Sequence, residues 1–146
     1  PAQSAAVLAV ASRVRTRHKG TQLTYSPKVF LPITNLCLDR CSYCTFRQDP
    51  DAPEAWTMLP EEVRAWSRRG AAQGCSEALL CLGDKPERAY RSYRRTLAVL
   101  GHATTIAYVA QACAIALDEG LLPHTNAGVM DRDELTALRP LNASMG

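Results

Sequence analysis

Three short apolar runs recur along the chain, and segments with helical character separate them. The runs are KVFLPI (28–33), EALLCL (77–82) and LLPHT (121–125). Short apolar runs of this length are typical of buried strands. Strands that alternate with helices predict a parallel sheet, because parallel neighbours are joined by long crossover connections. The sequence therefore predicts an α/β fold.

Helices are predicted between these runs from periodicity and from capping residues. Pro60 suits the first turn of a helix that we expect to bury Val63 and Trp66. Asp131 and Glu134 form an acidic capping box that begins the last helix. The expected helices are at 4–17, 60–73, 87–100, 104–119 and 132–138.

The length of the chain limits how much of a barrel it can form. A complete (β/α)8 barrel takes about 200–250 residues or more, whereas this chain has 146, and its final LNASMG reads as the start of a fourth strand. We expect the N-terminal half of a (β/α) barrel, with about three to four units. Residues 1–27 are predicted to be an N-terminal helix and linker, and 28–146 a truncated core domain. Its open strand edge predicts poor solubility and no activity in isolation.

Composition and charge argue against several functional classes. The net charge is only +3 and the basic residues are scattered, which is unlike a nucleic-acid-binding protein. No apolar run approaches the roughly 18 residues that span a bilayer. In the N-terminal segment the basic residues follow the apolar stretch AAVLAVA, which is the wrong order for a signal peptide. The six cysteines are expected to be reduced thiols in a cytoplasmic protein.

The densest group of chemically useful side chains follows the first apolar run, in TNLCLDRCSYCTF (34–46). Cys37, Cys41 and Cys44 are spaced C-x3-C-x2-C, with no fourth Cys or His nearby. Ordinary electron-transfer [4Fe–4S] clusters hold each of their four irons with a cysteine. Three thiolates leave one iron open, and an open position is how catalytic metal sites bind small molecules. The loop also follows the carboxyl end of a strand, where α/β proteins bind ligands.

A structural zinc site is the alternative interpretation of the three cysteines. It would recruit a distant histidine, His102 or His124. Structural zinc sites usually have two ligand pairs, and this chain has no second pair. The other cysteines, Cys75, Cys81 and Cys113, lie in apolar surroundings and are expected in the core.

The cysteine loop resembles the signature of the radical S-adenosylmethionine (SAM) superfamily. The resemblance extends over nearly the whole chain, to the N-terminal half of the FO synthases, whether as a separate CofG subunit or fused to CofH. It is carried by VFLPITNLCLDRCSYCTF, DPDAPEAWTMLPEEV, GCSEALLCLGDKPE and LLPHTNAGVM. CofH and the menaquinone-pathway enzymes usually read CxFCAF in place of CSYCTF. Departures from the family pattern are Leu38, Leu59 and Ala127, none of which is a cluster ligand.

The resemblance implies a [4Fe–4S] cluster whose free iron chelates the amino and carboxylate groups of SAM. The implied ligands are Cys37, Cys41 and Cys44. Tyr43 is expected against the adenine of SAM. Gly83 and Asp84 match the motif that receives the SAM amino group, with Glu87 as the alternative acid and a turn or helix cap as the alternative role of Asp84. His124 and Asn126, at the end of the third strand, are expected to face the cavity as catalytic, substrate-binding or structural residues.

The resemblance also implies the reaction. One electron would cleave SAM to methionine and a 5′-deoxyadenosyl radical. The radical would drive cyclisation of the adduct that CofH makes from tyrosine and 5-amino-6-(D-ribitylamino)uracil. The product of this lyase is FO, the deazaflavin of coenzyme F-420, with loss of ammonia. The implied partners are CofH and an electron donor such as ferredoxin or flavodoxin, with no nucleic acid and no membrane. The alternatives are a CofH-like or menaquinone-pathway enzyme and a structural zinc module.

Overall fold

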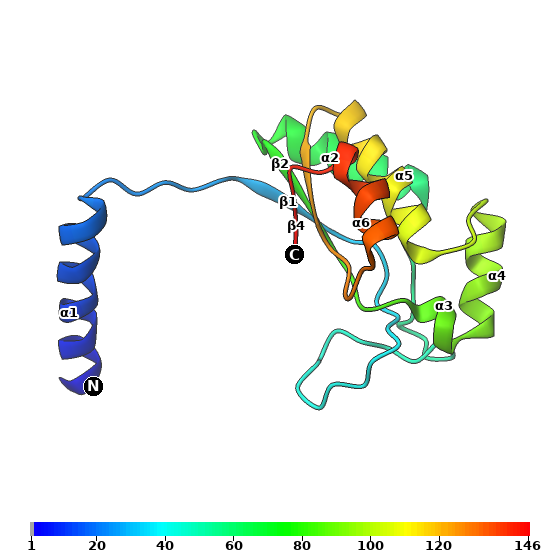
Figure 1. Ribbon diagram of the computed structural model, residues 1–146, viewed down its shortest axis with the longest axis horizontal. Helices are drawn as coiled ribbons and strands as arrows, with labels where there is room; N and C mark the ends of the chain where they lie inside the picture. The colour runs from blue at the N-terminus through cyan, green and yellow to red at the C-terminus, as the bar shows by residue number, and fades with distance from the viewer. Residues whose placement is uncertain (1) are drawn as a thin grey trace.

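Four parallel strands form a sheet in the order in which they occur in the chain (Figure 1). The computed structural model describes residues 2–146. The strands are β1 (Lys28–Pro32), β2 (Glu77–Cys81), β3 (Leu122–Asn126) and β4 (Ser144–Met145). Strands that follow one another in a parallel sheet, with helices between them, give the winding of a (β/α) barrel. The three predicted strands and the start of the fourth are confirmed.

The helices lie where the sequence predicted them, with one break. They are α1 (Ala2–Lys19), α2 (Pro60–Ala72), α3 (Pro86–Ala89), α4 (Arg91–Val99), α5 (Thr105–Asp118) and α6 (Arg132–Leu138), followed by the 3-10 turn η1 (Arg139–Leu141). The single helix expected at 87–100 is two helices. The backbone of Tyr90 between them is extended, with φ −119° and ψ 116°, and an extended residue ends a helix.

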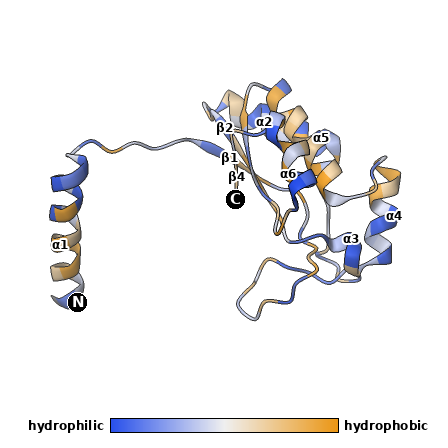
Figure 2. Cartoon of the chain, in the orientation of Figure 1, coloured by the Kyte–Doolittle hydropathy of each residue, from blue (hydrophilic) through white to orange (hydrophobic). Residues whose placement is uncertain are grey.

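The core lies between the sheet and the helices α2, α5 and α6, which cover one of its faces (Figure 1). The register places Leu31, Leu80 and Thr125 side by side, and all three are buried. Figure 2 shows apolar residues along the strands and on the helices that pack against them. Because side chains alternate along a strand, the residues between these face the opposite side, the side that a closed barrel would enclose.

The tryptophan that was expected to be buried on α2 is not in the core. Val63 is fully buried, whereas Trp66 is 52% exposed, so the prediction for Trp66 was wrong. The buried face of α2 consists of Val63, Ser67 and Gly70, spaced at i, i+4 and i+7. Trp66 lies beside this face and lines a surface cavity together with Phe30 of β1.

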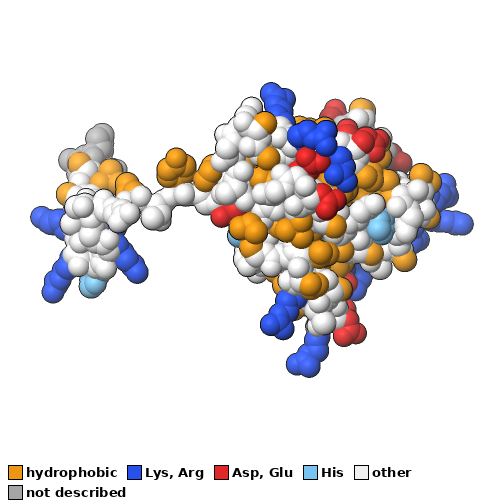
Figure 3. Space-filling view, turned by 90° about the horizontal axis from the view of Figure 1, so that it is seen from above, with side chains coloured by type: hydrophobic (Ala, Val, Ile, Leu, Met, Phe, Trp, Pro, Cys, Tyr) orange, Lys and Arg blue, Asp and Glu red, His pale blue; other side chains and the backbone are white. Residues whose placement is uncertain are grey.

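Helix α1 stands away from the sheet, joined to it by the segment 20–27 (Figure 1). Its apolar side chains remain largely exposed, from Val10 at 51% to Leu8 at 69%. Figure 3 shows basic side chains on this helix and others scattered around the body. None of the helices in residues 2–146 is both long and apolar enough to cross a membrane. The division between 1–27 and 28–146 remains a prediction.

Candidate functional site

The loops that follow β1, β2 and β3 all emerge at the carboxyl end of the sheet (Figure 1). The first is the long cysteine-bearing loop 33–59, the second is 82–85, and the third is 127–131. Carboxyl ends of parallel strands meet at one edge, which is where (β/α) barrels place their active sites. The predicted site residues therefore come from neighbouring loops.

Asn35 closes the base of the cysteine loop. Its side-chain amide donates to the carbonyl of Glu54 at 2.7 Å, and its Oδ1 accepts from the amide of Trp56 at 2.9 Å. Its backbone carbonyl also accepts from the amide of Gln48 at 2.9 Å. The side chain is buried, so these bonds are shielded from competing water. Sequence reasoning missed this role, although a polar residue directly after an apolar strand was the available signal.

Arg47 provides a second anchor for the loop. Its guanidinium donates to Asp49 at 2.6 Å and to the hydroxyl of Tyr90 at 2.7 Å, which ties the loop to the start of α4. Arg40 donates to the same carboxylate at 2.8 Å. The hydrogen bond from Arg47, with a smaller contribution from Arg40, holds the pKa of the Asp49 carboxyl below its usual value. The conformation of the cysteine loop is therefore stabilised by residues other than its three cysteines.

Cys37 lies where the cysteine loop meets the loop after β2. The amides of Asp39 and Asp84 point at its sulfur, at N···S distances of 3.3 and 3.2 Å. The amide of Leu38 donates to the carbonyl of Asp84 at 2.7 Å. Amide groups directed at sulfur are among the contacts that tune iron–sulfur sites. The two loops are thus joined at Cys37 by main-chain hydrogen bonds.

Gly83 leaves the space that Cys37 occupies. A Cβ atom built on Gly83 would lie 2.4 Å from both Cβ and Sγ of Cys37. Real Cβ atoms do not approach other atoms so closely, so only glycine fits while Cys37 stays in place. The structure therefore brings together Cys37, Gly83 and Asp84, whose binding roles remain predictions.

The remaining predicted ligands lie on the exposed part of the loop. Cys41 and Cys44 are exposed and are joined by a turn, in which the amide of Cys44 donates to the carbonyl of Cys41 at 3.1 Å. Tyr43 is 85% exposed. In residues 2–146 no three His, Cys, Asp or Glu side chains converge as they would on a single metal ion. A [4Fe–4S] cluster needs no such convergence, because each thiolate binds a different iron.

Asp84 has a carboxylate oxygen with no partner. Its Oδ1 is buried and forms no hydrogen bond within the described residues. Gly128, at φ +75°, packs so closely that a Cβ there would lie 2.8 Å from Cα of Asp84. The N-cap position of α3 is Lys85, without a side-chain cap, so Asp84 does not fill the alternative role of a cap. A buried polar atom without a partner costs about 1–3 kcal/mol and calls for an explanation such as a ligand.

Glu87, the alternative acid, is already engaged. Its carboxylate accepts from the amide of Thr105 at 3.1 Å and from the hydroxyl of the same residue. Thr105 is the first residue of α5, so Glu87 accepts a hydrogen bond from a backbone amide that the helix itself leaves without an acceptor. Of the two acids, Asp84 is the one with a free buried oxygen.

His124 takes part in a polar network on the inner face of the sheet. Its Nδ1 is hydrogen-bonded to Ser144 Oγ, and its Nε2 lies 2.8 Å from Glu77 Oε2. The latter two atoms are close but form no hydrogen bond. Lys28 also pairs with Glu77 at 2.8 Å and, with Ser26, lowers the pKa of that carboxyl. One ring nitrogen of His124 is therefore hydrogen-bonded, and the other has no hydrogen-bond partner among the described residues.

The histidines required by the zinc alternative do not join the cysteines. His102 lies 2.9 Å from Gln111 Oε1 and packs against the ring of Tyr108.

The side chain of Asn126 is exposed, and its carbonyl accepts from the amide of Leu82. Cys113 is fully buried as expected and Cys75 packs against the core, whereas Cys81 is half-buried on the opposite face of β2, so its placement in the core was wrong.

Comparison with solved structures defines the class of the fold. The chain is similar to the FeFe-hydrogenase maturase HydG from Carboxydothermus hydrogenoformans, with a TM-score of 0.69 over 92% of this chain and 28% of that one. Sequence identity is 19%, so the likeness concerns the fold. The structure is a partial (β/α) barrel of the radical SAM type, with a three-cysteine loop after its first strand.

Sequence comparison finds named enzymes that are similar to this chain. No protein-family model matches the chain. It is 49% identical to the 7,8-didemethyl-8-hydroxy-5-deazariboflavin synthase of Methanosarcina barkeri over 85% of this chain. It is 44% identical to the FO synthase of Streptomyces avermitilis over 93% of this chain. Over these spans the chain is similar to enzymes named as FO synthases.

The match covers only part of those relatives. The chain spans 38% of the Methanosarcina barkeri protein and 17% of the Streptomyces avermitilis protein.

Proposed function

We propose that this chain forms the cluster- and SAM-binding part of an FO synthase, a lyase of coenzyme F-420 biosynthesis. The identity to named FO synthases over 85–93% of the chain supports the proposal. The observation that carries it is the contact of Cys37 with Gly83, beside the free buried oxygen of Asp84. A cysteine ligand and an unpaired acid at adjoining strand ends suit a cluster that binds an amino acid derivative.

The residues present fit the cofactors that the family implies. Cys37, Cys41 and Cys44 would hold three irons of a [4Fe–4S] cluster, since two are exposed and the third is bordered by amide donors. When bound, the cluster supplies the electron that cleaves SAM and starts radical chemistry. Asp84 would accept the ammonium group of SAM. Tyr43, exposed beside Cys44, would lie against the adenine.

The substrate and partners are part of the same proposal. The complete protein would cyclise the adduct of tyrosine and 5-amino-6-(D-ribitylamino)uracil to FO, with loss of ammonia. CofH, as a subunit or a fused domain, would supply this adduct, and a ferredoxin or flavodoxin in the cytoplasm would supply electrons. Formation of FO from the CofH product distinguishes this activity from that of CofH-like or menaquinone-pathway enzymes, which would leave that product unchanged.

Replacement of Asp84 by Asn tests the SAM-binding role. The loss of one charge-assisted hydrogen bond, worth about 1.5–3 kcal/mol, should raise the dissociation constant of SAM roughly 10- to 100-fold. Iron content should be unchanged, because Asp84 is not a cluster ligand. Asp51→Asn, an exposed acid of the cysteine loop, serves as the matched control. Unchanged SAM affinity in Asp84→Asn would show that this carboxylate does not bind SAM.

A further inference from the structure

Lys85 combines two unfavourable features at one position. Its side chain is buried, at 4% exposure, although it carries a charge. Its backbone has φ +22°, and it is the one non-glycine residue in the described part of the chain with a positive φ. Buried charges and backbone conformations of this kind persist only where the surrounding structure enforces them, and they cluster at functional sites. Lys85 directly follows Asp84 and is not itself a predicted site residue.

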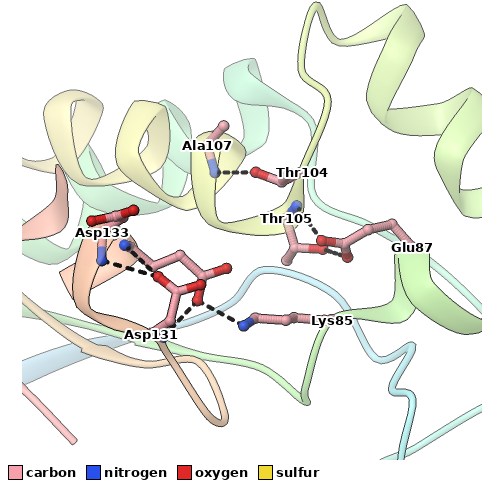
Figure 4. Close-up of polar contacts among 8 residues, drawn as sticks. Lys85, Glu87, Thr104, Thr105, Ala107, Asp131 and Asp133 are labelled. Carbon is pink, nitrogen blue, oxygen red and sulfur yellow. Dashed lines mark hydrogen bonds and ion pairs between the residues drawn. The ribbon is translucent and has the colours of Figure 1, made fainter. Parts of the chain in front are cut away.

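Glu134 holds the buried ammonium group. The Nζ atom of Lys85 lies 2.6 Å from Oε2 of Glu134. The same oxygen accepts from the amide of Asp131 at 2.8 Å, and Oδ1 of Asp131 accepts from the amides of Asp133 and Glu134. Figure 4 shows Lys85 reaching across to this capping box at the start of α6. The ion pair therefore joins the loop after β2 to the first turn of α6.

Glu87 fastens the other end of the same short segment. It binds the amide and hydroxyl of Thr105 at the start of α5 (Figure 4). Thr104 caps that helix separately, by accepting from the amide of Ala107 at 3.1 Å. The stretch from Lys85 to Glu87 is thus held at both ends by helices of the later part of the chain.

The position of Lys85 determines the position of Asp84. The amide of Asp84 donates to Sγ of Cys37, and its carbonyl accepts from the amide of Leu38. The backbone of Asp84 therefore cannot rotate without breaking the contact between the two loops. Gly128, from the loop that leads to α6, closes against the Asp84 side chain. The ion pair between Lys85 and Glu134 therefore links the residue that follows Asp84 to the helix behind the loop that carries Gly128.

We propose that Lys85 is a positioning residue for SAM, acting through its ion pair with Glu134. The pair holds Asp84 so that its carboxylate faces the ligand while its amide stays on Cys37. This inference rests on the proposed function and deepens it, because it makes the unit formed by β3 and α6 a part of the SAM site.

The test compares Lys85→Met and Lys85→Gly in the complete protein that carries this sequence, after anaerobic loading with iron and sulfide. Both variants should bind SAM about 10- to 100-fold more weakly, with unchanged iron content, as is usual for residues that orient a ligand. Lys85→Gly should resist urea better than Lys85→Met, because glycine adopts the left-handed backbone without strain. The two variants would then share a weak SAM affinity but differ in urea stability. A merely structural role predicts instead that the affinity follows the stability.

Two further variants complete the comparison. Glu134→Gln should weaken SAM binding in the same direction, and Lys85→Met/Glu134→Gln should be no weaker than Lys85→Met alone. Glu119→Gln breaks a remote ion pair with Arg68 and should leave SAM affinity unchanged. SAM affinity within twofold of wild type in Lys85→Met, or affinities that simply follow the urea stabilities, would overturn the inference.

Amide hydrogen exchange tests the positioning without any cofactor. In the cluster-free protein, Lys85→Met should accelerate exchange at the amides of Leu38 and Asp84 about tenfold or more, while the amide of Leu80 in β2 stays protected. Unchanged exchange at Leu38 and Asp84 contradicts the positioning role. If wild type binds no SAM but exchange still accelerates, the proposed function fails and the coupling between loops stands.

Discussion

Gly83 and Cys37 show how closely two residues from different loops have to fit. The motif spacing of the cysteines and the glycine–acid pair after the second strand could both be predicted, because each is a local pattern in the sequence. Lys85 could not be recognised in the same way. Its partner Glu134 is 49 residues away in the chain, so only the fold brings the charges together.

Gly83→Ala tests the contact at Cys37. The added Cβ would lie 2.4 Å from Sγ of Cys37, so either the thiol or the loop has to move. We expect a loss of about 1–3 kcal/mol in the free energy of unfolding, as for other overpacked sites, together with reduced iron content after reconstitution.

The matched control is Gly120→Ala. That glycine has φ +81° and open space around it, so the substitution costs only the backbone strain of about 1–2 kcal/mol. Iron content should remain at the wild-type value. Equal iron content in both alanine variants would contradict the account of Gly83.

We expect the ion pairs of Glu119 to make a contribution to stability that is lost in acid. Arg68, and to a smaller extent Arg64, lowers the pKa of its carboxyl below the ordinary value of 4.5. The unfolded chain therefore takes up the proton first as the pH falls. The stabilisation is fully present above pH 4.5 and is lost as the pH falls through the lower pKa of the folded state.

Urea unfolding at about pH 6 and about pH 3 measures this contribution. Wild type should lose more stability between the two values than Glu119→Gln, in which no proton can be taken up at this position. Parallel losses in the two proteins would show that the pair with Arg68 contributes nothing to the acid sensitivity.

At the level of elements, periodicity and caps were sufficient to predict nearly every strand and helix. The capping box of Asp131 and Glu134 begins α6 as expected, since it is a local signal. The break at Tyr90 was missed because the polar segment around it has no apolar periodicity. Trp66 was misplaced because its packing depends on the open side of β1, which a helical pattern does not reveal.

The cysteine loop is the element whose order depends most on one residue. Asn35→Ala would leave the carbonyl of Glu54 and the amide of Trp56 without their partner. We expect a loss of about 1–3 kcal/mol in the free energy of unfolding and faster tryptic cleavage after Arg40.

Gln48→Ala is the control for the Asn35 variant. It removes an amide side chain from the same loop that makes no hydrogen bond among residues 2–146, and cleavage should stay at the wild-type rate. Equal cleavage rates for Asn35→Ala and wild type would show that Asn35 does not hold the loop.

At the scale of the whole molecule, the sheet has one face covered by helices and one face left open. The exposed side of β1 includes Phe30, which is 47% accessible, and among the described strands β1 and β4 each have one unpaired edge. The expectation that this chain is poorly soluble in isolation follows from these edges and remains a prediction. The partial barrel could be predicted from the strand–helix order, because parallel strands wind in one direction.

The central claim is that three cysteines, and not four or six, hold an iron–sulfur cluster. The direct measurement is iron and sulfide content after anaerobic reconstitution, compared across single Cys→Ala variants of all six cysteines. About four irons should bind to wild type and to the variants of Cys75, Cys81 and Cys113, with loss of the cluster in those of Cys37, Cys41 and Cys44. Stoichiometric zinc in place of iron, or an intact cluster in Cys41→Ala, would contradict it.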